Sequence, residues 1–549
     1  MKKFLCAVLT AAALAAGVLS PARAAAPFTD VPPDSWAAEV ITSAADAGLM
    51  GGVGDGKFGY GKTVTRAEFV TVLCRMLGWA LITPETPSFS DVPAGQWYFP
   101  YIETALARGA IDGGNSFAPQ APIRRADMAV TLVRVLGYKT LAEQLEKSAQ
   151  LPFTDVREKL GYIAVARDIG MINGMSATTF APENTATREQ AAAMLVRVYD
   201  KYTAKIGWLH GFYALSSYAQ RYTADSMDGV SFGWSVMRWD GANGARLDTS
   251  LGDWKIPESY ESATGYLEQR GVPAHLGVYM DASGGLAGLL ASPEAREQAA
   301  AAILGEVTRV YDAIGKSPYS GVTVDFEGLR AAQKADFTAF LTPLSLMLKA
   351  EGLSLYVTVQ PVTADGVYFD GYDYRAIGRL ADKVILMAHN YAPATLDGFV
   401  GTEWQKNAPL TPLAEIYCAL QAITDPVTGV EDADKIALAL SFSAVGWHVT
   451  EDGRVAFPEP VYPSLATVAA RLRQIDTVSG WSEAYRNPYI LYRTESGERI
   501  FLWYEDARSI SEKLALARLF GVTGASVWRI GSIPDFDGYN VWETIAAQR

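Results

Sequence analysis

The chain has few of the residues that disulfide scaffolds and metal sites require. Among its 549 residues are three cysteines, Cys6, Cys74 and Cys418, which lie far apart and without metal-ligand spacing, so a disulfide-stapled scaffold is excluded. The four histidines stand singly, at 210, 275, 389 and 448, which argues against a zinc hydrolase with a histidine-pair motif. Basic residues are also fewer than acidic ones. Sixty acids face 47 lysines and arginines, a net charge of −13, which excludes a general binder of nucleic acids or anionic membranes.

Long apolar runs are missing after the first residues. Residues 1–24 combine Lys2 and Lys3, an apolar run and the small-x-small sequence Ala22-Arg23-Ala24, which predicts a cleaved signal peptide rather than a retained anchor helix. No later run approaches the ~18 apolar residues of a membrane span. We therefore expect a secreted protein with no membrane span after signal cleavage. Its composition, 49% hydrophobic and 19% charged, is that of folded domains.

Three repeats follow the signal peptide. FTDV at 28–31, FSDV at 89–92 and FTDV at 153–156 open the copies. Each continues through an Ala-rich helical pattern, a Gly-rich turn and a second helix, which starts at TRAE, RRAD or TREQ. Thr followed three residues later by Glu or Gln forms a helix capping box, so the first and third copies have a structural reason for these residues.

One arginine at each second helix is not required by the capping box. Arg66, Arg125 and Arg188 stand at the helix N-termini, where the charge adds to the helix dipole and free backbone N–H groups. Three such arginines on an acidic protein indicate an anionic ligand held by local charge. The alternative is that each arginine pairs with a nearby acid.

The triplet resembles surface-layer homology repeats, whose ITRAE-like motif stands here as VTRAE, IRRAD and ATREQ. The resemblance implies an all-α, pseudo-threefold domain with repeats at 27–83, 88–140 and 152–202. It implies binding to a pyruvylated secondary cell-wall polymer, contacted by Arg66, Arg125 and Arg188, with Trp36 and Trp97 lining the grooves. Because the third copy has Tyr162 in place of Trp and the second lacks the capping Thr, the grooves need not bind equally.

From about residue 203 short apolar runs alternate with helical segments, which is typical of parallel α/β architecture. Eight runs fit an eight-stranded (β/α)8 TIM barrel at 203–549 with an insertion at 449–510. A doubly wound sheet is the alternative, although no GxGxxG turn follows the first run. The expected strands are Ile206–Tyr213, Val230–Met237, Ala274–Met280, Gly321–Glu327, Ser354–Val359, Lys383–Met387, Lys435–Phe442 and Ala525–Trp528.

The fourth of these strands carries two acids. Side chains alternate along a strand, so Thr323, Asp325 and Glu327 share one face. Carboxylates at the end of an apolar strand are costly to bury unless they are used, and in a barrel they would lie at the catalytic mouth. Like charges at this spacing raise one pKa, which suits Glu327 to act as a general acid. The alternative is two solvated acids beside a turn.

This strand, SGVTVDFE at 320–327, resembles the DGxDxDxE signature of family 18 glycoside hydrolases. HGFYALSSY, ILMAHNYAP, LALSFSAVGW and the stretch ending in SVWRIG fit the same family, and the last is most similar to its spore-germination and cortex-lytic branch. The resemblance implies substrate-assisted retaining hydrolysis with no metal or cofactor. It implies that Glu327 is the acid, Asp325 its partner, and that the substrate contacts are Tyr213, His389, Asn390, Tyr391 and Trp528.

Three departures qualify the resemblance. Ser320 and Thr323 replace signature aspartates, so the carboxylate relay behind Asp325 is missing, and His389 stands where the family has a tyrosine. The leading hypothesis is an anchored hydrolase cutting β-1,4 bonds next to N-acetylglucosamine, in peptidoglycan. The alternatives are a chitinase, a lectin-like wall protein with weak catalysis, a structural surface-layer subunit, and a metal enzyme using His389 and His448, for which no third ligand is found.

Overall fold

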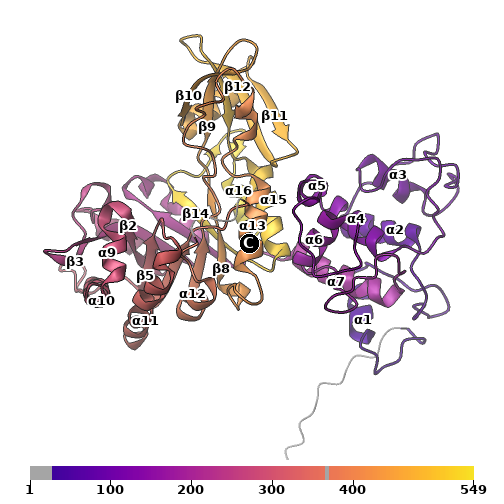
Figure 1. The fold of residues 1–549 in the computed structure, drawn as a ribbon, viewed down its shortest axis with the longest axis horizontal. Coiled ribbons are helices and arrows are strands. Elements are labelled where there is room, and N and C mark those ends of the chain that lie inside the picture. The colour runs from indigo at the N-terminus through magenta and orange to yellow at the C-terminus, as the bar shows by residue number, and fades with distance from the viewer. Residues whose placement is uncertain (1–27, 365–369) are drawn as a thin grey trace, which may run out of the picture. The chain divides into compact units, whose positions relative to one another are not determined.

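The computed structural model describes residues 28–364 and 370–549, so the expected signal peptide lies outside the described residues. The chain divides into two compact units (Figure 1). The first combines the repeats up to Thr131 with Pro182–Val196, and the second combines Leu132–Ala181 with Arg197–Arg549. Within the described ranges, no helix is both long and apolar enough to cross a bilayer.

The repeat region is helical, as the sequence predicts, and short β-bridges join its copies. The bridges pair Thr63 with Thr187, Thr65 with Pro122 and Arg124 with Thr185. Each of these segments directly precedes the second helix of its repeat, so the three copies meet around one centre. The helices are α1 (Ala38–Asp46), α2 (Arg66–Met76), α3 (Phe99–Ala107), α4 (Arg125–Val135), α5 (Lys139–Leu145), α6 (Leu160–Asp168) and α7 (Arg188–Thr203).

The aspartate of the opening motif folds each repeat locally. The Asp30 carboxylate accepts hydrogen bonds from the backbone of Phe58 at 2.7 Å and of Gly59 at 2.8 Å. Asp91 accepts from Phe117 at 2.8 Å in the same way, and Asp155 accepts from Phe180 at 2.9 Å. Since a carboxylate held by two or three N–H groups fixes a turn, FTDV is conserved between the copies for a structural reason.

The second helix of the first repeat has the predicted capping box. The hydroxyl of Thr65 accepts from the backbone N–H of Glu68 at 3.2 Å, and the Glu68 carboxylate accepts from the Thr65 N–H at 2.8 Å. In the third repeat half of the box forms: the Gln190 side chain accepts from the Thr187 N–H at 3.2 Å. The Thr187 hydroxyl itself is buried without a hydrogen-bond partner in the described chain.

The large unit contains a closed barrel of eight parallel strands, so the predicted TIM barrel is confirmed and the doubly wound alternative is wrong. The strand order is β1-β14-β8-β7-β6-β5-β4-β2, and pairing of β1 with β2 closes it. All eight strands lie where the sequence predicts them. Their bounds are β1 Trp208–Tyr213, β2 Gly229–Asp240, β4 Ala274–Met280, β5 Gly321–Phe326, β6 Ser354–Val359, β7 Lys383–Leu386, β8 Ile436–Ser441 and β14 Gly524–Ile530.

Helices cover the outside of the barrel (Figure 1). A 3-10 segment, η1 (Leu215–Ser226), stands in place of the first helix, and β3 (Gly244–Asp248) forms an antiparallel hairpin with β2. The remaining helices are α8 (Tyr260–Glu268), α9 (Leu286–Ala291), α10 (Pro293–Val307), α11 (Lys334–Ala350), α12 (Tyr374–Leu380), α13 (Leu413–Ile423), α15 (Ala507–Leu519) and α16 (Trp542–Ala547).

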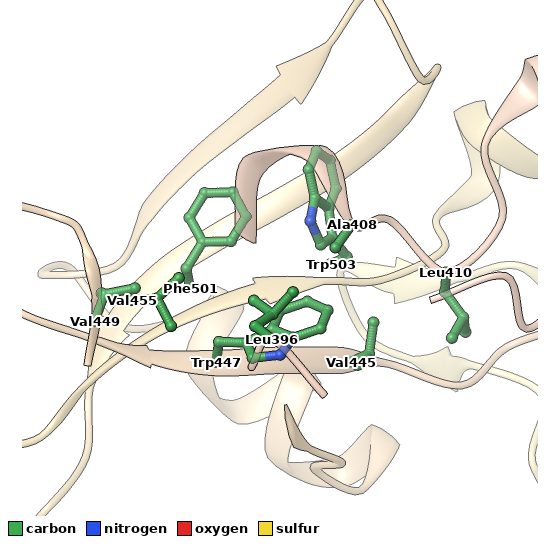
Figure 2. Packing of buried hydrophobic residues seen from close by; sticks show 9 residues of the cluster. All are labelled: Leu396, Ala408, Leu410, Val445, Trp447, Val449, Val455, Phe501 and Trp503. Atoms are coloured by element: carbon green, nitrogen blue, oxygen red, sulfur yellow. The ribbon is translucent and has the colours of Figure 1, made fainter. Parts of the chain in front are cut away.

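The insertion between β8 and α15 is a second, antiparallel sheet. It runs from β9 (Val445–Val449) to β13 (Arg499–Trp503), through β10 (Val455–Val461), α14 (Leu465–Leu472), β11 (Val478–Ser482) and β12 (Asn487–Arg493). It begins earlier than the expected 449, because β9 starts at Val445, and it ends before the expected 510, because α15 is a barrel helix. Figure 2 shows its core, in which Trp447, Phe501 and Trp503 pack with Leu396 from the loop after β7.

The outer face of β5 explains why its acids point inward. Phe326 is fully buried and its ring stacks on Phe340 of α11 at a centroid distance of 5.1 Å. Val322 and Val324 on the same face are also fully buried. Because side chains alternate along a strand, burying these three against the helices turns Thr323 and Asp325 into the barrel.

Candidate active site

Two carboxyl groups meet at the carboxyl end of β5. Asp325 is 6% exposed, and its Oδ1 accepts a 2.6 Å hydrogen bond from the hydroxyl of Thr358 on β6. Glu327 is the first residue after β5, and its backbone N–H donates to the carbonyl of Met280 at 2.8 Å. This bond extends the β4–β5 pairing past the end of the strand, so Glu327 is held at the mouth on the same face as Asp325.

Burial disfavours the charged form of both acids. It raises the pKa of Asp325, although the Thr358 hydrogen bond acts in the opposite direction. Burial is also the main reason that the pKa of Glu327 is raised well above its usual range, and the charges of Asp325 and Asp281 raise it further. Since two neighbouring carboxylates cannot both ionise cheaply, burial and mutual repulsion favour the form of the pair that keeps one proton, as a general acid requires.

A cavity of about 210 Å³ is lined by Asp325, whereas Glu327, two residues further on, is not among its lining residues. It brings together three residues expected from the sequence: Tyr213 at the end of β1, Asp325, and Trp528 near the end of β14. The Trp528 ring packs edge-on against Phe212 at 5.1 Å, which fixes it as one wall of the cavity. Aromatic faces pack well against the apolar faces of sugar rings, so the cavity has the chemistry of a sugar site.

His389, Asn390 and Tyr391 follow β7 at the same end of the barrel but are not among the residues lining this cavity. Both ring nitrogens of His389 are shielded from solvent and lack a hydrogen-bond partner in the described chain, and so does the Tyr391 hydroxyl. Burial lowers the pKa of His389 to about 4. The imidazole is therefore neutral at physiological pH, with Asn390 the one group that favours its charged form.

Hydroxyls and imidazoles occupy the barrel interior behind Asp325. The Thr323 hydroxyl lies 2.5 Å from that of Ser231 and 3.3 Å from Nδ1 of His275. Nε2 of His210 lies 2.8 Å from the same Ser231 hydroxyl. Burial lowers the pKa of His275 to about 3 and that of His210 well below its ordinary value. This network is neutral, so it fills the space behind Asp325 without supplying a second carboxylate.

Sequence reasoning missed two further aromatic residues of the cavity wall, Trp254 and Tyr279. The rings of Trp254 and Tyr279 stack at 4.5 Å, and both line the cavity. The Tyr279 hydroxyl donates to Asp281 at 3.0 Å. Tyr279 and Asp281 stand at the end of a predicted strand, and that position could have identified them. Trp254 belongs to a short 3-10 turn, η2 (Gly252–Trp254), and no local pattern marks it.

Arg529, also missed, follows Trp528 through a cis peptide bond and lines the same cavity. Its Nη2 donates to the Ser216 hydroxyl at 3.1 Å. The other histidine considered for a metal site, His448, lies on β9, where Nδ1 is 3.7 Å from Glu498. His389 instead follows a barrel strand, so the structure gives these two histidines different neighbours.

The expected polymer-binding residues differ from one another in exposure. Trp36 and Trp97 are 59% and 54% exposed, as groove residues would be. The Arg66 guanidinium stacks over the Phe117 ring at 4.6 Å, and its side chain is 30% exposed. Arg125 and Arg188 are buried.

The contacts of Arg188 lie inside the repeats. Its guanidinium donates to the carbonyls of Phe58 and Gly51 at 2.9 and 3.0 Å and to the carboxylate of Glu68 at 2.6 Å. These three hydrogen-bond partners hold the arginine within the repeats. Arg66 donates in the same way to the carbonyl of Phe117 at 2.9 Å, but Asp127, its nearest acid, lies 3.8 Å away.

Comparisons with known proteins fall on the two parts of the chain separately. The family described as "Glycosyl hydrolases family 18" matches residues 276–532, and the "S-layer homology domain" matches residues 27–70, 88–129 and 152–192. A crystal structure of the C-terminal domain of a proposed chitinase from Desulfitobacterium hafniense DCB-2 superimposes with a TM-score of 0.50 at 19% identity, covering 63% of this chain and 99% of that one. At this identity the likeness concerns the fold.

Curated relatives match less than half of the chain each. The S-layer protein of Bacillus thuringiensis subsp. finitimus is 32% identical over 213 residues, which cover 37% of this chain and 25% of that protein. The cortical fragment-lytic enzyme of Bacillus subtilis is 26% identical over 216 residues, covering 39% of this chain and 47% of that enzyme. The chain thus spans half or less of the length of these relatives.

Proposed function

We propose, on the premise that the barrel belongs to the family 18 glycoside hydrolases and follows three S-layer homology repeats, that the protein hydrolyses a glycan of its own cell wall. The bonds cut are β-1,4 bonds next to N-acetylglucosamine, in peptidoglycan. The protein is secreted and associated with the cell surface through its repeats. The observation that carries the proposal is the pair of acids at the carboxyl end of β5, Asp325 and Glu327, of which Asp325 lines a cavity together with Trp528.

The chemistry follows from that pair. The acetamido oxygen of the substrate attacks the anomeric carbon while the bond to the leaving oxygen breaks and Glu327 gives that oxygen its proton. The Asp325 carboxylate accepts the acetamido N–H and stabilises the positive oxazolinium ion that results. Glu327, now charged, takes a proton from water, whose oxygen attacks the anomeric carbon and reopens the ring. Glu327 is then protonated again and configuration is retained.

The anchor half of the proposal rests on the repeats. An anionic, pyruvylated wall polymer would meet the Arg66 guanidinium, with Trp36 and Trp97 exposed to pack against its sugars. The Arg125 and Arg188 guanidinium groups are buried, and Arg188, paired with Glu68, would support the shape of the binding surface. The Cys74 and Cys418 thiols are free, so this surface protein is held together by packing and hydrogen bonds.

The test is a digestion with a matched variant. Full-length protein is incubated with purified peptidoglycan and, separately, with chitin oligomers, and the products are identified by mass. We expect new N-acetylglucosamine reducing ends from peptidoglycan, because water attacks the anomeric carbon of the sugar whose acetamido group takes part. Glu327→Gln keeps the shape but has no proton to give, so turnover should fall by at least about 10²–10⁴-fold while binding persists.

The outcomes separate the alternatives. Cleavage of chitin oligomers alone would replace the peptidoglycan proposal by a chitinase. Binding without products from either glycan would favour a lectin-like wall protein. Wild-type rates in the Glu327→Gln protein would rule out the mechanism whichever glycan is cut.

A further inference from the structure

Arg529 brings positive charge to an otherwise acidic cavity. Among the described residues that line the 210 Å³ cavity, the other charged groups are Asp253 and Asp325. The two aspartates therefore repel an anionic group of a substrate, whereas the Arg529 guanidinium attracts one. Such an asymmetry orients a glycan whose sugars differ in charge.

A second cavity of about 530 Å³ continues beyond Trp528 and Arg529, which line both cavities. Its remaining described lining residues are uncharged and combine aromatic rings with hydroxyl and amide groups, among them Tyr462, Phe536, Ser443, Ser464 and Gln220. Tyr462 is 65% exposed. These are the groups that bind sugars, so the cleft has room for a second sugar with Arg529 at the junction.

The structure gives Arg529 no acid to neutralise it. In the described chain it makes no ion pair, its Nη2 donates to the Ser216 hydroxyl at 3.1 Å, and its Nε is shielded from solvent without a hydrogen-bond partner. A shielded donor without a partner is costly, and a guanidinium is matched in shape and charge by a carboxylate. Ser216 holds one side of the group and leaves the other donors free.

We propose that Arg529 selects glycans that carry a carboxylate on the sugar next to N-acetylglucosamine, as the lactyl ether of muramic acid does wherever no stem peptide is attached to it. This inference rests on the proposed hydrolase function. The acetamido sugar lies against Trp528 beside Glu327, its neighbour enters the 530 Å³ cavity, and the carboxylate of that neighbour meets the Arg529 guanidinium. A neutral chitin oligomer leaves the arginine without a charged partner, and Arg529 thereby separates the two substrate classes.

The test compares glycans that differ in the carboxylate alone. The substrates are peptide-free oligomers of alternating N-acetylglucosamine and N-acetylmuramic acid, the same oligomers with the carboxyl reduced to an alcohol, and chitin oligomers of equal length. For the carboxylate glycan, Arg529→Gln should lower kcat/KM about 10–100-fold, the range of a charged hydrogen bond. The reduced glycan and chitin should be cut nearly as before. The loss of kcat/KM should be smaller in Arg529→Lys, because lysine keeps the positive charge but lacks the paired N–H donors of the guanidinium.

Arg309→Gln is the matched control, because Arg309 pairs with Glu306 before β5, at the opposite end of the barrel. Equal losses on carboxylate and reduced glycans, or no loss on either, would overturn the proposal. So would an Arg529 effect seen only when a stem peptide is attached, since the recognised carboxylate would then be on the peptide.

If the wild-type protein cuts none of these glycans, the hydrolase function fails, and the Arg529 proposal is still tested by binding. In the Glu327→Gln protein, calorimetry should show tighter binding of the carboxylate glycan than of the reduced one. Arg529→Gln or Arg529→Lys in that background should shrink the difference. Equal affinities for the two glycans would overturn the proposal.

Discussion

The hydroxyl of Thr358 donates a 2.6 Å hydrogen bond to Oδ1 of Asp325. Both side chains are buried in the barrel, one on β6 and the other on β5. In the family signature a carboxylate stands behind this aspartate, whereas here Thr323 joins a neutral network of hydroxyls and imidazoles. The Thr358 hydrogen bond is consequently what favours the charged form of Asp325, and with it the proton on Glu327.

Replacing Thr358 by Val should shift the acidic limb of the pH–activity profile upward. The hydrogen bond lowers the pKa of Asp325 against the effect of burial, so its loss raises that pKa by about one unit. Asp325 then competes better for the proton of the pair, and kcat should fall as well. Profiles of kcat/KM against pH for the wild type, Thr358→Val and Thr358→Ser test this prediction. Thr358→Ser, which keeps the hydroxyl, should resemble wild type.

His389 should not limit activity near neutral pH. Burial lowers its pKa to about 4, so the imidazole becomes protonated only below about pH 5. Any acidic limb that disappears in His389→Tyr is therefore expected below that pH, where a charged imidazole repels the oxazolinium ion. A pH profile that is measured from 3.5 to 8 checks this. A limb near pH 6.5 that His389→Tyr removes would contradict it.

Lys513 and Glu505 form an ion pair buried at the base of the insertion, with side-chain exposures of 2% and 1%. Asn487 and Ser509 also donate to Glu505, at 2.7 and 2.6 Å. Lys513→Met leaves that carboxylate charged without a cation, so unfolding of the barrel should require about 3–5 kcal/mol less. Urea denaturation followed by tryptophan fluorescence measures it.

The matched control for that prediction is Lys316→Met, which breaks the exposed ion pair with Glu268, a kind of pair worth about 0–1 kcal/mol. The double change Lys513→Met with Glu505→Leu should recover much of the loss, because the uncompensated charge is gone. A double variant as unstable as Lys513→Met would show that packing, not charge, causes the effect.

Arg66 and Arg188 should differ in what they do for anchoring. Arg66→Ala removes a partly exposed cation and should weaken binding to isolated cell walls with little change in Tm. Arg188→Ala leaves Glu68 and two backbone carbonyls without their donor and should lower the Tm of the repeats. Wall pull-down and calorimetric scans of the full chain separate the two effects. If the wild-type protein binds equally well to walls stripped of the anionic polymer, the repeats do not anchor through that polymer, and neither arginine has the proposed role.

Local sequence patterns were sufficient for the elements and for the acids. Alternation along Gly321–Glu327 places Asp325 and Glu327 on one face, and apolar runs of strand length located all eight barrel strands to within a few residues. The repeats were evident because FTDV and the arginine motif recur in register. These signals are local, since a strand or helix period is set by backbone geometry that neighbouring residues share.

The tertiary structure decided which side chains meet. Ser231, Thr323 and His275 come from three strands, and nothing in their separate segments indicates that their polar atoms touch. Likewise the stacking of Trp254 on Tyr279, and the position of Arg529 between two cavities, depend on loops brought together when β1 pairs with β2 and the barrel closes. The sequence alone determined the periodicity of the helices and strands and the repeated motifs, because these depend on neighbours in the chain. Closure of the barrel determined partners and charge environment, because burial and hydrogen bonding depend on neighbours in space.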